Sequence, residues 1–164
     1  MVILITGGLG QVGSYLCERL SDSNEVTILD NFSNNLNNIE LSSDVKIIRE
    51  RVSNGQNPVI FGDGNQSRDF VYIEDVVYAI FKAMENKRAI GEIFNIGTGR
   101  PTRIKELAEV IIKISNKKLK PEFAPEQVGD IRESYADITK AEEIMGYKPE
   151  YLLEQGLRLC ANYK

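Results

Sequence analysis

The sequence predicts an α/β fold built around a parallel sheet with flanking helices. An apolar, β-branched run at residues 2–5 leads into a glycine-rich turn. A segment with helical spacing follows directly, and a second apolar run ends at Asp30. Two short strands joined by a crossover helix are typical of a βαβ unit, in which the strands lie parallel.

The first fifty residues supply this predicted sheet. We expect strands at residues 2–5 and 25–30, with a helix over residues 11–20 between them. The apolar run at residues 45–48 predicts a third strand.

The pattern changes after residue 50. Short strands are expected at residues 58–61 and 69–73, around a turn that contains Gly62 and Gly64. Asp75 is a suitable N-cap for a helix that runs to about Asn86.

The remaining elements complete the α/β pattern. Residues 92–96 predict a strand, and Thr102 begins a helix with an apolar stripe. Two shorter helices are expected at residues 139–145, ended by Gly146, and at residues 152–162.

Composition excludes several classes of function. The chain has 164 residues and a formal net charge of −4, which argues against a general binder of nucleic acids or anionic membranes. It contains no histidine, the commonest general base, and its two cysteines, Cys17 and Cys160, form no metal-binding pattern. Since neither a signal segment nor a membrane span is visible, we expect a cytoplasmic protein.

Three glycines form the clearest motif. Gly7, Gly10 and Gly13 lie between a predicted strand and a predicted helix, where glycine lets the backbone approach a pyrophosphate. The helix N-terminus then offers unpaired N–H groups to the phosphates. Asp30 ends the next strand, where ribose hydroxyls would lie, and an acid there favours NAD over NADP. The alternative is a glycine-rich turn that only closes a strand–helix junction.

These residues carry a family resemblance. Residues 6–13 resemble the TGGxGxxG loop of the nucleotide-sugar epimerases and dehydratases, extended short-chain dehydrogenases that include UDP-glucose 4-epimerase. Residues 30–34 resemble the loop on the adenosine side. Further matches follow in order at residues 61–75, 94–99, 129–130 and 135–141. The resemblance implies a Rossmann-like fold, NAD as cofactor, and a cofactor site formed by Gly7, Gly10, Gln11, Val12, Gly13, Asp30, Asn31 and Asn34.

The middle of the family pattern is missing. Members are roughly twice as long, and between residues 48 and 51 this chain lacks the later Rossmann strands and the Tyr-x-x-x-Lys helix of the active site. The expected fold is therefore a truncated Rossmann domain at residues 1–50, followed by a small substrate-binding part at residues 51–164. We also expect weakened NAD binding and an uncovered sheet edge, through which copies of the chain would form a homo-oligomer.

One literal Tyr-x-x-x-Lys match remains, at Tyr78 and Lys82. Helical spacing places both with Glu85 on the face opposite Val77 and Phe81, so we expect a solvated face. No catalytic residue is assigned. In the family, this tyrosine exchanges a proton with the sugar hydroxyl while hydride moves, and without it hydride transfer has no proton acceptor.

The resemblance also implies a site for a nucleotide-sugar such as a UDP-sugar. Arg68 takes the position of an arginine that binds the diphosphate; alternatively, it is an exposed side chain paired with Asp63 or Asp69. Gln127 stands where the family usually has a second arginine, which leaves UDP-sugar binding in question. Asp130 either accepts a ribose hydroxyl or is an ordinary turn carboxylate.

Three functions remain open. The sequence predicts a UDP-glucose 4-epimerase-related NAD-binding protein, catalytically impaired or with its missing half supplied by another chain. The second is a non-catalytic dinucleotide- or nucleotide-binding module. The third is a deletion product without a function of its own.

Overall fold

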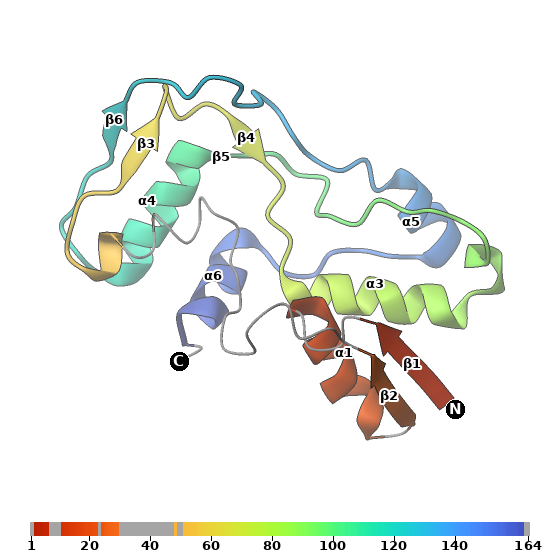
Figure 1. Cartoon of the computed structure of the whole chain (residues 1–164). Coiled ribbons are helices and arrows are strands. Elements are labelled where there is room, and N and C mark those ends of the chain that lie inside the picture. Colours follow the sequence, from red (N-terminus) through yellow and green to blue (C-terminus); the bar gives the residue numbers. More distant parts are fainter. Residues whose placement is uncertain (1, 7–10, 23, 30–47, 49–50, 163–164) are drawn as a thin grey trace.

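Short strands and amphipathic helices alternate in the computed structural model, which describes residues 2–6, 11–22, 24–29, 48 and 51–162 (Figure 1). The elements are β1 Val2–Thr6, α1 Gln11–Ser21, β2 Glu25–Leu29, β3 Val59–Phe61, β4 Ser67–Arg68, α3 Ile73–Glu85, the 3₁₀ helix η1 Lys87–Ala89, β5 Thr102–Arg103, α4 Ile104–Ser115, β6 Glu122–Ala124, α5 Thr139–Met145 and α6 Leu153–Asn162.

The N-terminal βαβ unit is confirmed. β1 and β2 pair in parallel, with Val2 opposite Glu25 and Thr6 opposite Leu29, and α1 connects them. α1 lies against α3 through a buried cluster of Leu16, Leu20 and Val77 (Figure 1). The first strands are therefore held to the later part of the chain by apolar burial.

Two further strand pairs position the later segments. β3 pairs with β6 in parallel, and β4 pairs with β5 antiparallel. The strand predicted at residues 58–61 is thus confirmed as β3. Because β4 and β5 are only two residues long, their place depends on the helices and side chains packed around them.

Two more apolar clusters form the core of this later part. One gathers around α4, where Ile104, Leu107 and Ile111 lie on one helix face against Ile60 of β3. The other joins Ala79 of α3 with residues of α5 and the loop that follows it: Ala141, Met145 and Tyr147. The division into residues 1–50 and 51–164 stays a prediction.

Several predicted elements differ from the structure. Ile48 is helical, so the strand over residues 45–48 is wrong at that residue, and residues 45–47 lie outside the described part. Residues 69–73 are not a strand: the paired strand is β4, and α3 already begins at Ile73. Residues 92–96 form no strand either, although Phe94 and Ile96 pack against the second cluster, so their apolar alternation reflects side-chain packing rather than a ladder.

The helix boundaries need two corrections. Asp75 is not the N-cap of α3, a position held by Tyr72; it lies in the first turn, is almost fully buried, and accepts hydrogen bonds from the backbone N–H groups of Glu150 (2.9 Å) and Tyr151 (3.3 Å). The helix predicted from Thr102 begins at Ile104, after β5. α5 ends at Gly146 as predicted, in the left-handed conformation (φ 66°).

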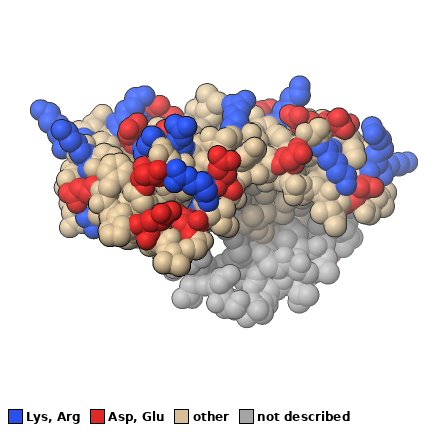
Figure 2. Space-filling view, turned by 90° about the horizontal axis from the view of Figure 1, so that it is seen from above, with Lys and Arg blue, Asp and Glu red and all other residues tan. Residues whose placement is uncertain are grey.

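Charge is mixed on the described part of one face of the molecule. In the described part of the face shown in Figure 2, basic and acidic side chains alternate without a broad patch of one sign. No helix within the described residues has the length and apolar character needed to cross a membrane.

Candidate functional site

The structure brings the two predicted substrate residues together. The Arg68 guanidinium, at the end of β4, donates from Nη2 to Asp130 Oδ1 (2.5 Å) and from Nη1 to the carbonyl oxygens of Ile131 (2.6 Å) and Ser67 (2.8 Å). Both side chains of the ion pair are about one-quarter exposed. Arg68 is therefore partly desolvated and paired with Asp130. The alternative pairing with Asp63 or Asp69 is wrong.

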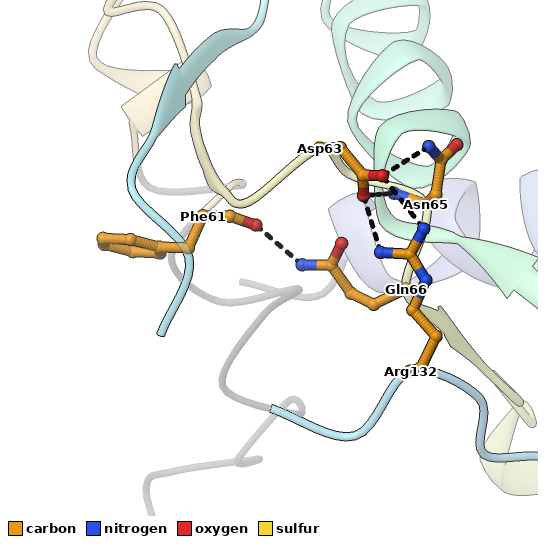
Figure 3. Close-up of polar contacts among 5 residues, drawn as sticks. All are labelled: Phe61, Asp63, Asn65, Gln66 and Arg132. Carbon is orange, nitrogen blue, oxygen red and sulfur yellow. Dashed lines mark hydrogen bonds and ion pairs between the residues drawn. The ribbon is translucent and has the colours of Figure 1, made fainter. Parts of the chain in front are cut away.

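Asp63 pairs instead with Arg132, a residue that the sequence analysis did not single out (Figure 3). Two parallel bonds, Nη1 to Oδ1 (3.0 Å) and Nη2 to Oδ2 (2.9 Å), join guanidinium and carboxylate. Asn65 donates to the same carboxylate from its backbone N–H and its side-chain amide. These donors hold the pKa of Asp63 well below its ordinary value, while the carboxylate raises the pKa of Arg132.

A neighbouring side chain fixes the turn that carries Asp63. Gln66 is buried, and its Nε2 donates to the carbonyl oxygen of Phe61 (2.8 Å), across the turn (Figure 3). Gly62 and Gly64 in this turn both have positive φ angles. The turn therefore presents Asp63 to Arg132 from a fixed backbone.

The Asp69 carboxylate is the acceptor of a second group of hydrogen bonds at the site. It accepts bonds from the backbone N–H groups of Thr98, Gly99 and Ala136, and from the Thr98 hydroxyl. A Cβ on Gly97 would lie 2.8 Å from the Ala136 Cβ, so only glycine fits there without a shift. Gly97 and Gly99 therefore shape a turn.

An open cavity of about 710 Å³ lies between these segments. Arg68 forms part of its wall, and the lining combines aromatic rings with hydroxyl, amide and carboxylate groups. The lining residues are Arg68, Asp69, Phe70, Phe94, Asn95, Ile96, Ser134, Tyr135, Ala136 and Asp137. A cavity with a guanidinium, aromatic rings and convergent polar groups is suited to a polar ligand.

Tyr147 also supports the turn at Gly97. It is fully buried, and its hydroxyl donates to the carbonyl oxygen of Gly97 (2.8 Å). Burial raises the pKa of this phenol, and the nearby carboxylates of Asp75 and Asp69 add to the effect. At neutral pH the phenol therefore stays protonated and donates a hydrogen bond to the turn that Asp69 fixes.

The interpretation of Asp130 as a turn carboxylate holds in part. Its backbone N–H donates to the carbonyl oxygen of Gln127 (3.3 Å), which closes a turn. Its side chain, however, is the partner of Arg68. Gln127 is exposed and, as expected, adds no second cation here.

Most of the predicted cofactor residues lie outside the described part of the chain: Gly7, Gly10, Asp30, Asn31 and Asn34. Of the others, Gln11 begins α1, Val12 is exposed, and Gly13 is buried within the helix. Four residues separate the end of β1 at Thr6 from the start of α1 at Gln11, and β1 pairs in parallel with β2. A strand followed closely by a helix and a parallel second strand is the setting in which a glycine-rich segment binds a dinucleotide.

The solvated face predicted for Tyr78, Lys82 and Glu85 is wrong for Tyr78, which is half-buried, whereas Glu85 is exposed. The Tyr78 ring packs against the second apolar cluster, with its centroid 6.5 Å from that of Tyr147. Lys82 Nζ lies over the Tyr78 ring, 5.2 Å from its centroid. Neither residue is among those that line the cavity beside Arg68.

Within the described residues, no group of three or more acidic or cysteine side chains is placed to hold a metal ion.

Comparison with known proteins identifies the family. The model of the NAD dependent epimerase/dehydratase family matches residues 3–47 and 40–97. A UDP-glucose 4-epimerase of Mycolicibacterium smegmatis is 38% identical over 113 residues, which are 69% of this chain and 36% of that protein. The chain thus spans about a third of the length of such curated relatives.

Solved structures share the fold. A UDP-glucose 4-epimerase from Thermotoga maritima, crystallised with UDP-glucose, superposes with a TM-score of 0.84 at 22% identity, covering 99% of this chain and 98% of that chain. A UDP-glucuronic acid 4-epimerase from Bacillus cereus in complex with NAD gives a TM-score of 0.76 at 17% identity, covering 100% of both chains. The family model covers more than half of the chain, and the curated relatives are more than 30% identical over about two thirds of it: the chain belongs to the NAD dependent epimerase/dehydratase family.

Proposed function

We propose that this chain is a UDP-glucose 4-epimerase-related protein that binds a nucleoside diphosphate sugar beside Arg68 and NAD at the N-terminal end of α1. The observation that carries the proposal is the position of Arg68, a partly buried guanidinium in the wall of a polar cavity. A planar guanidinium with fixed donors suits the oxygens of a diphosphate.

The cavity offers further groups for the rest of such a ligand. The rings of Phe94 and Tyr135 provide apolar faces, while Asn95 and Ser134 provide hydrogen-bonding groups. Sugars are bound by this combination of ring faces and polar side chains. We therefore place the sugar end of the ligand in the cavity and the diphosphate at Arg68.

The residues of the N-terminal unit fit NAD. α1 begins shortly after β1, Gly13 is buried in its first turn, and the parallel β2 leads toward Asp30. Gly7 and Gly10 would let the pyrophosphate approach the backbone, and the N–H groups at the start of α1 would receive it. When bound, NAD supplies the acceptor and donor of a hydride.

Among the described residues, no paired tyrosine and lysine line the cavity to accept the proton of such a hydride step. The chain's one Tyr-x-x-x-Lys match, Tyr78 to Lys82, is packed away from the cavity. A hydroxyl whose proton has no acceptor does not release a hydride at a useful rate. We therefore propose ligand binding with impaired turnover.

We also propose that two copies associate through the small N-terminal sheet. In the described residues that sheet contains β1 and β2 alone, and a short parallel sheet with a free edge can pair with another strand. Light scattering coupled to size-exclusion chromatography tests this point: a dimer is expected, and a clean monomer at high concentration contradicts it.

Titration of UDP into the purified chain, followed by calorimetry, tests the proposed substrate site. Arg68→Gln should remove most of the affinity, because it deletes the cation that faces the diphosphate. Arg88→Gln is the matched control, since Arg88 is an exposed arginine that does not line the cavity. Equal UDP affinity in Arg68→Gln and the unaltered chain would refute the assignment.

A turnover assay tests the catalytic part. Incubated with NAD and UDP-galactose, the chain should form no UDP-glucose above the rate measured without protein. Conversion that survives removal of contaminating enzyme would refute the proposal of impaired catalysis.

A further inference from the structure

The segment over residues 125–131, called the strap here, connects β6 to the bridge at β4 (Figure 1). It contains neither helix nor strand, and most of its side chains are exposed, with Val128 fully so. Both ends are fixed: Gly62 N–H donates to the Ala124 carbonyl (2.9 Å), and Ser67 N–H donates to the Arg132 carbonyl (2.9 Å). The strap is thus a short exposed arm between two anchors.

In the described structure, the hydrogen bonds that tie the strap to other segments all end on Arg68. They are the bond from Nη2 to Asp130 Oδ1 and the bond from Nη1 to the Ile131 carbonyl. The next residue, Arg132, is held independently by its paired bonds to Asp63. Release of Arg68 would therefore free the strap and leave its C-terminal anchor in place.

The Arg68 guanidinium has two possible anionic partners, Asp130 within the chain and the diphosphate of a ligand. The guanidinium is the group proposed above to bind a diphosphate, yet it already carries an internal anion, Asp130. A diphosphate and a carboxylate compete for the same donors, and both side chains are only about one-quarter exposed. Ligand binding would exchange one anion for the other.

We propose that Asp130 is a built-in competitor for Arg68, which a diphosphate must displace, and that the strap leaves Arg68 when the ligand binds. The inference rests on the proposed function, because it concerns the same guanidinium. Displacement requires little structural change, since the strap has few other bonds to break. The internal anion would weaken the binding of every ligand that reaches Arg68 through phosphate.

Inorganic pyrophosphate is the probe that isolates this competition, because it has no ribose with which Asp130 could interact. Titrations followed by NMR chemical shifts compare the unaltered chain with Asp130→Asn, which keeps the shape and removes the charge. We expect about two- to fivefold tighter pyrophosphate binding by Asp130→Asn, the range for loss of one partly exposed ion pair. Glu109→Gln, the same charge change on the exposed face of α4, should bind like the unaltered chain.

Equal or weaker pyrophosphate binding by Asp130→Asn overturns the inference if Arg68→Gln still loses binding; the proposed site then stands without a competitor. If neither pyrophosphate nor UDP binds the unaltered chain or Asp130→Asn, the proposed function itself fails. The two failures are therefore distinguishable.

Hydrogen exchange on the unaltered chain gives a second test that needs no variant. Saturation with UDP should increase exchange of the Asp130 N–H, which donates to the Gln127 carbonyl (3.3 Å), while the anchored backbone N–H of Ser67 stays protected. Unchanged or slower exchange of the Asp130 N–H in the presence of UDP would contradict the release of the strap.

Discussion

Replacement of Asp69 is the most informative test of how the site is built. Its carboxylate accepts bonds from three backbone N–H groups and one hydroxyl, all from the segments around Gly97–Gly99 and Ala136. Asp69→Ala leaves these donors without an acceptor in a partly buried place. A hydrogen bond to a charged acceptor contributes about 1.5–3 kcal/mol, and contributions within one network do not add fully. We therefore expect a loss of about 3–5 kcal/mol in the free energy of unfolding.

Asp69→Asn should be milder, because the two carboxylate oxygens have different partners. Oδ2 faces backbone donors alone, whereas Oδ1 also faces the Thr98 hydroxyl, which can turn and accept a bond. An asparagine with its NH₂ in the place of Oδ1 keeps most of the network. A loss of about 1–2 kcal/mol is expected.

Urea unfolding followed by circular dichroism measures both variants, with Glu109→Ala as a control on an exposed carboxylate. For a slope of about 2 kcal/mol/M, the midpoint of Asp69→Ala should fall by roughly 2 M. A midpoint shift in Asp69→Ala no larger than that of Glu109→Ala would refute the view that Asp69 holds the turn. Equal losses in the Ala and Asn variants would refute the division of roles between the two oxygens.

Three further variants test the surroundings of the site. The pKa of Tyr147 is raised, so the hydroxyl's contribution to stability is complete below the ordinary tyrosine pKa of about 10 and is lost as the pH rises above that value. Tyr147→Phe should therefore lower the free energy of unfolding by about 1–2 kcal/mol at pH 7 and reduce the loss of stability at alkaline pH. Urea titrations at pH 7 and pH 11 measure both effects. The pKa of Asp63 is lowered, so its pairing with Arg132 stabilises the fold above about pH 4 and is lost as pH falls below that; Asp63→Asn should flatten the acid side of the stability profile, and an unchanged acid side would contradict this. Gly97→Ala introduces a Cβ that would lie 2.8 Å from the Ala136 Cβ, so a lower melting temperature and a weaker UDP signal are expected, and an unaltered melting curve would show that the turn is looser than described.

Local patterns predicted the N-terminal unit well. The β-branched run of β1, the helical spacing of α1 and the second apolar run each depend on neighbouring residues, and all three elements appear within about one residue of their predicted bounds. The stop at Gly146 was predictable for the same reason, since a left-handed C-terminal residue is a local property of glycine.

The failures occur where distant residues decide the structure. Asp75 has the right chemistry for an N-cap, but its carboxylate instead accepts bonds from Glu150 and Tyr151, far along the chain. Asp69 is similar. Its carboxylate accepts bonds from Thr98 and Gly99, which are distant in the sequence, and the strand predicted over residues 69–73 does not form. No local pattern shows such partners.

The sequence predicted which residues belong to the candidate site, but not how they are arranged. The family resemblance indicated Arg68 and Asp130, yet nothing in their spacing of 62 residues predicts that they bind one another. Arg132 was missed because an exposed arginine near an aspartate is common; its two-bond geometry appears only when the turn at Asp63 is built. On the cofactor side, Gly7, Gly10 and Asp30 lie outside the described residues, so their roles stay predictions.

We propose that this chain has two nucleotide sites, one for NAD and one for a nucleoside diphosphate. A single calorimetric experiment tests both sites: titration of NAD and of UDP into the unaltered chain, Gly10→Val and Arg68→Gln. We expect that both ligands bind the unaltered chain, that Gly10→Val loses NAD alone because a side chain fills the space of the pyrophosphate, and that Arg68→Gln loses UDP alone. Absence of binding of either ligand by the unaltered chain at millimolar concentration, or losses that do not separate between the two variants, would contradict it.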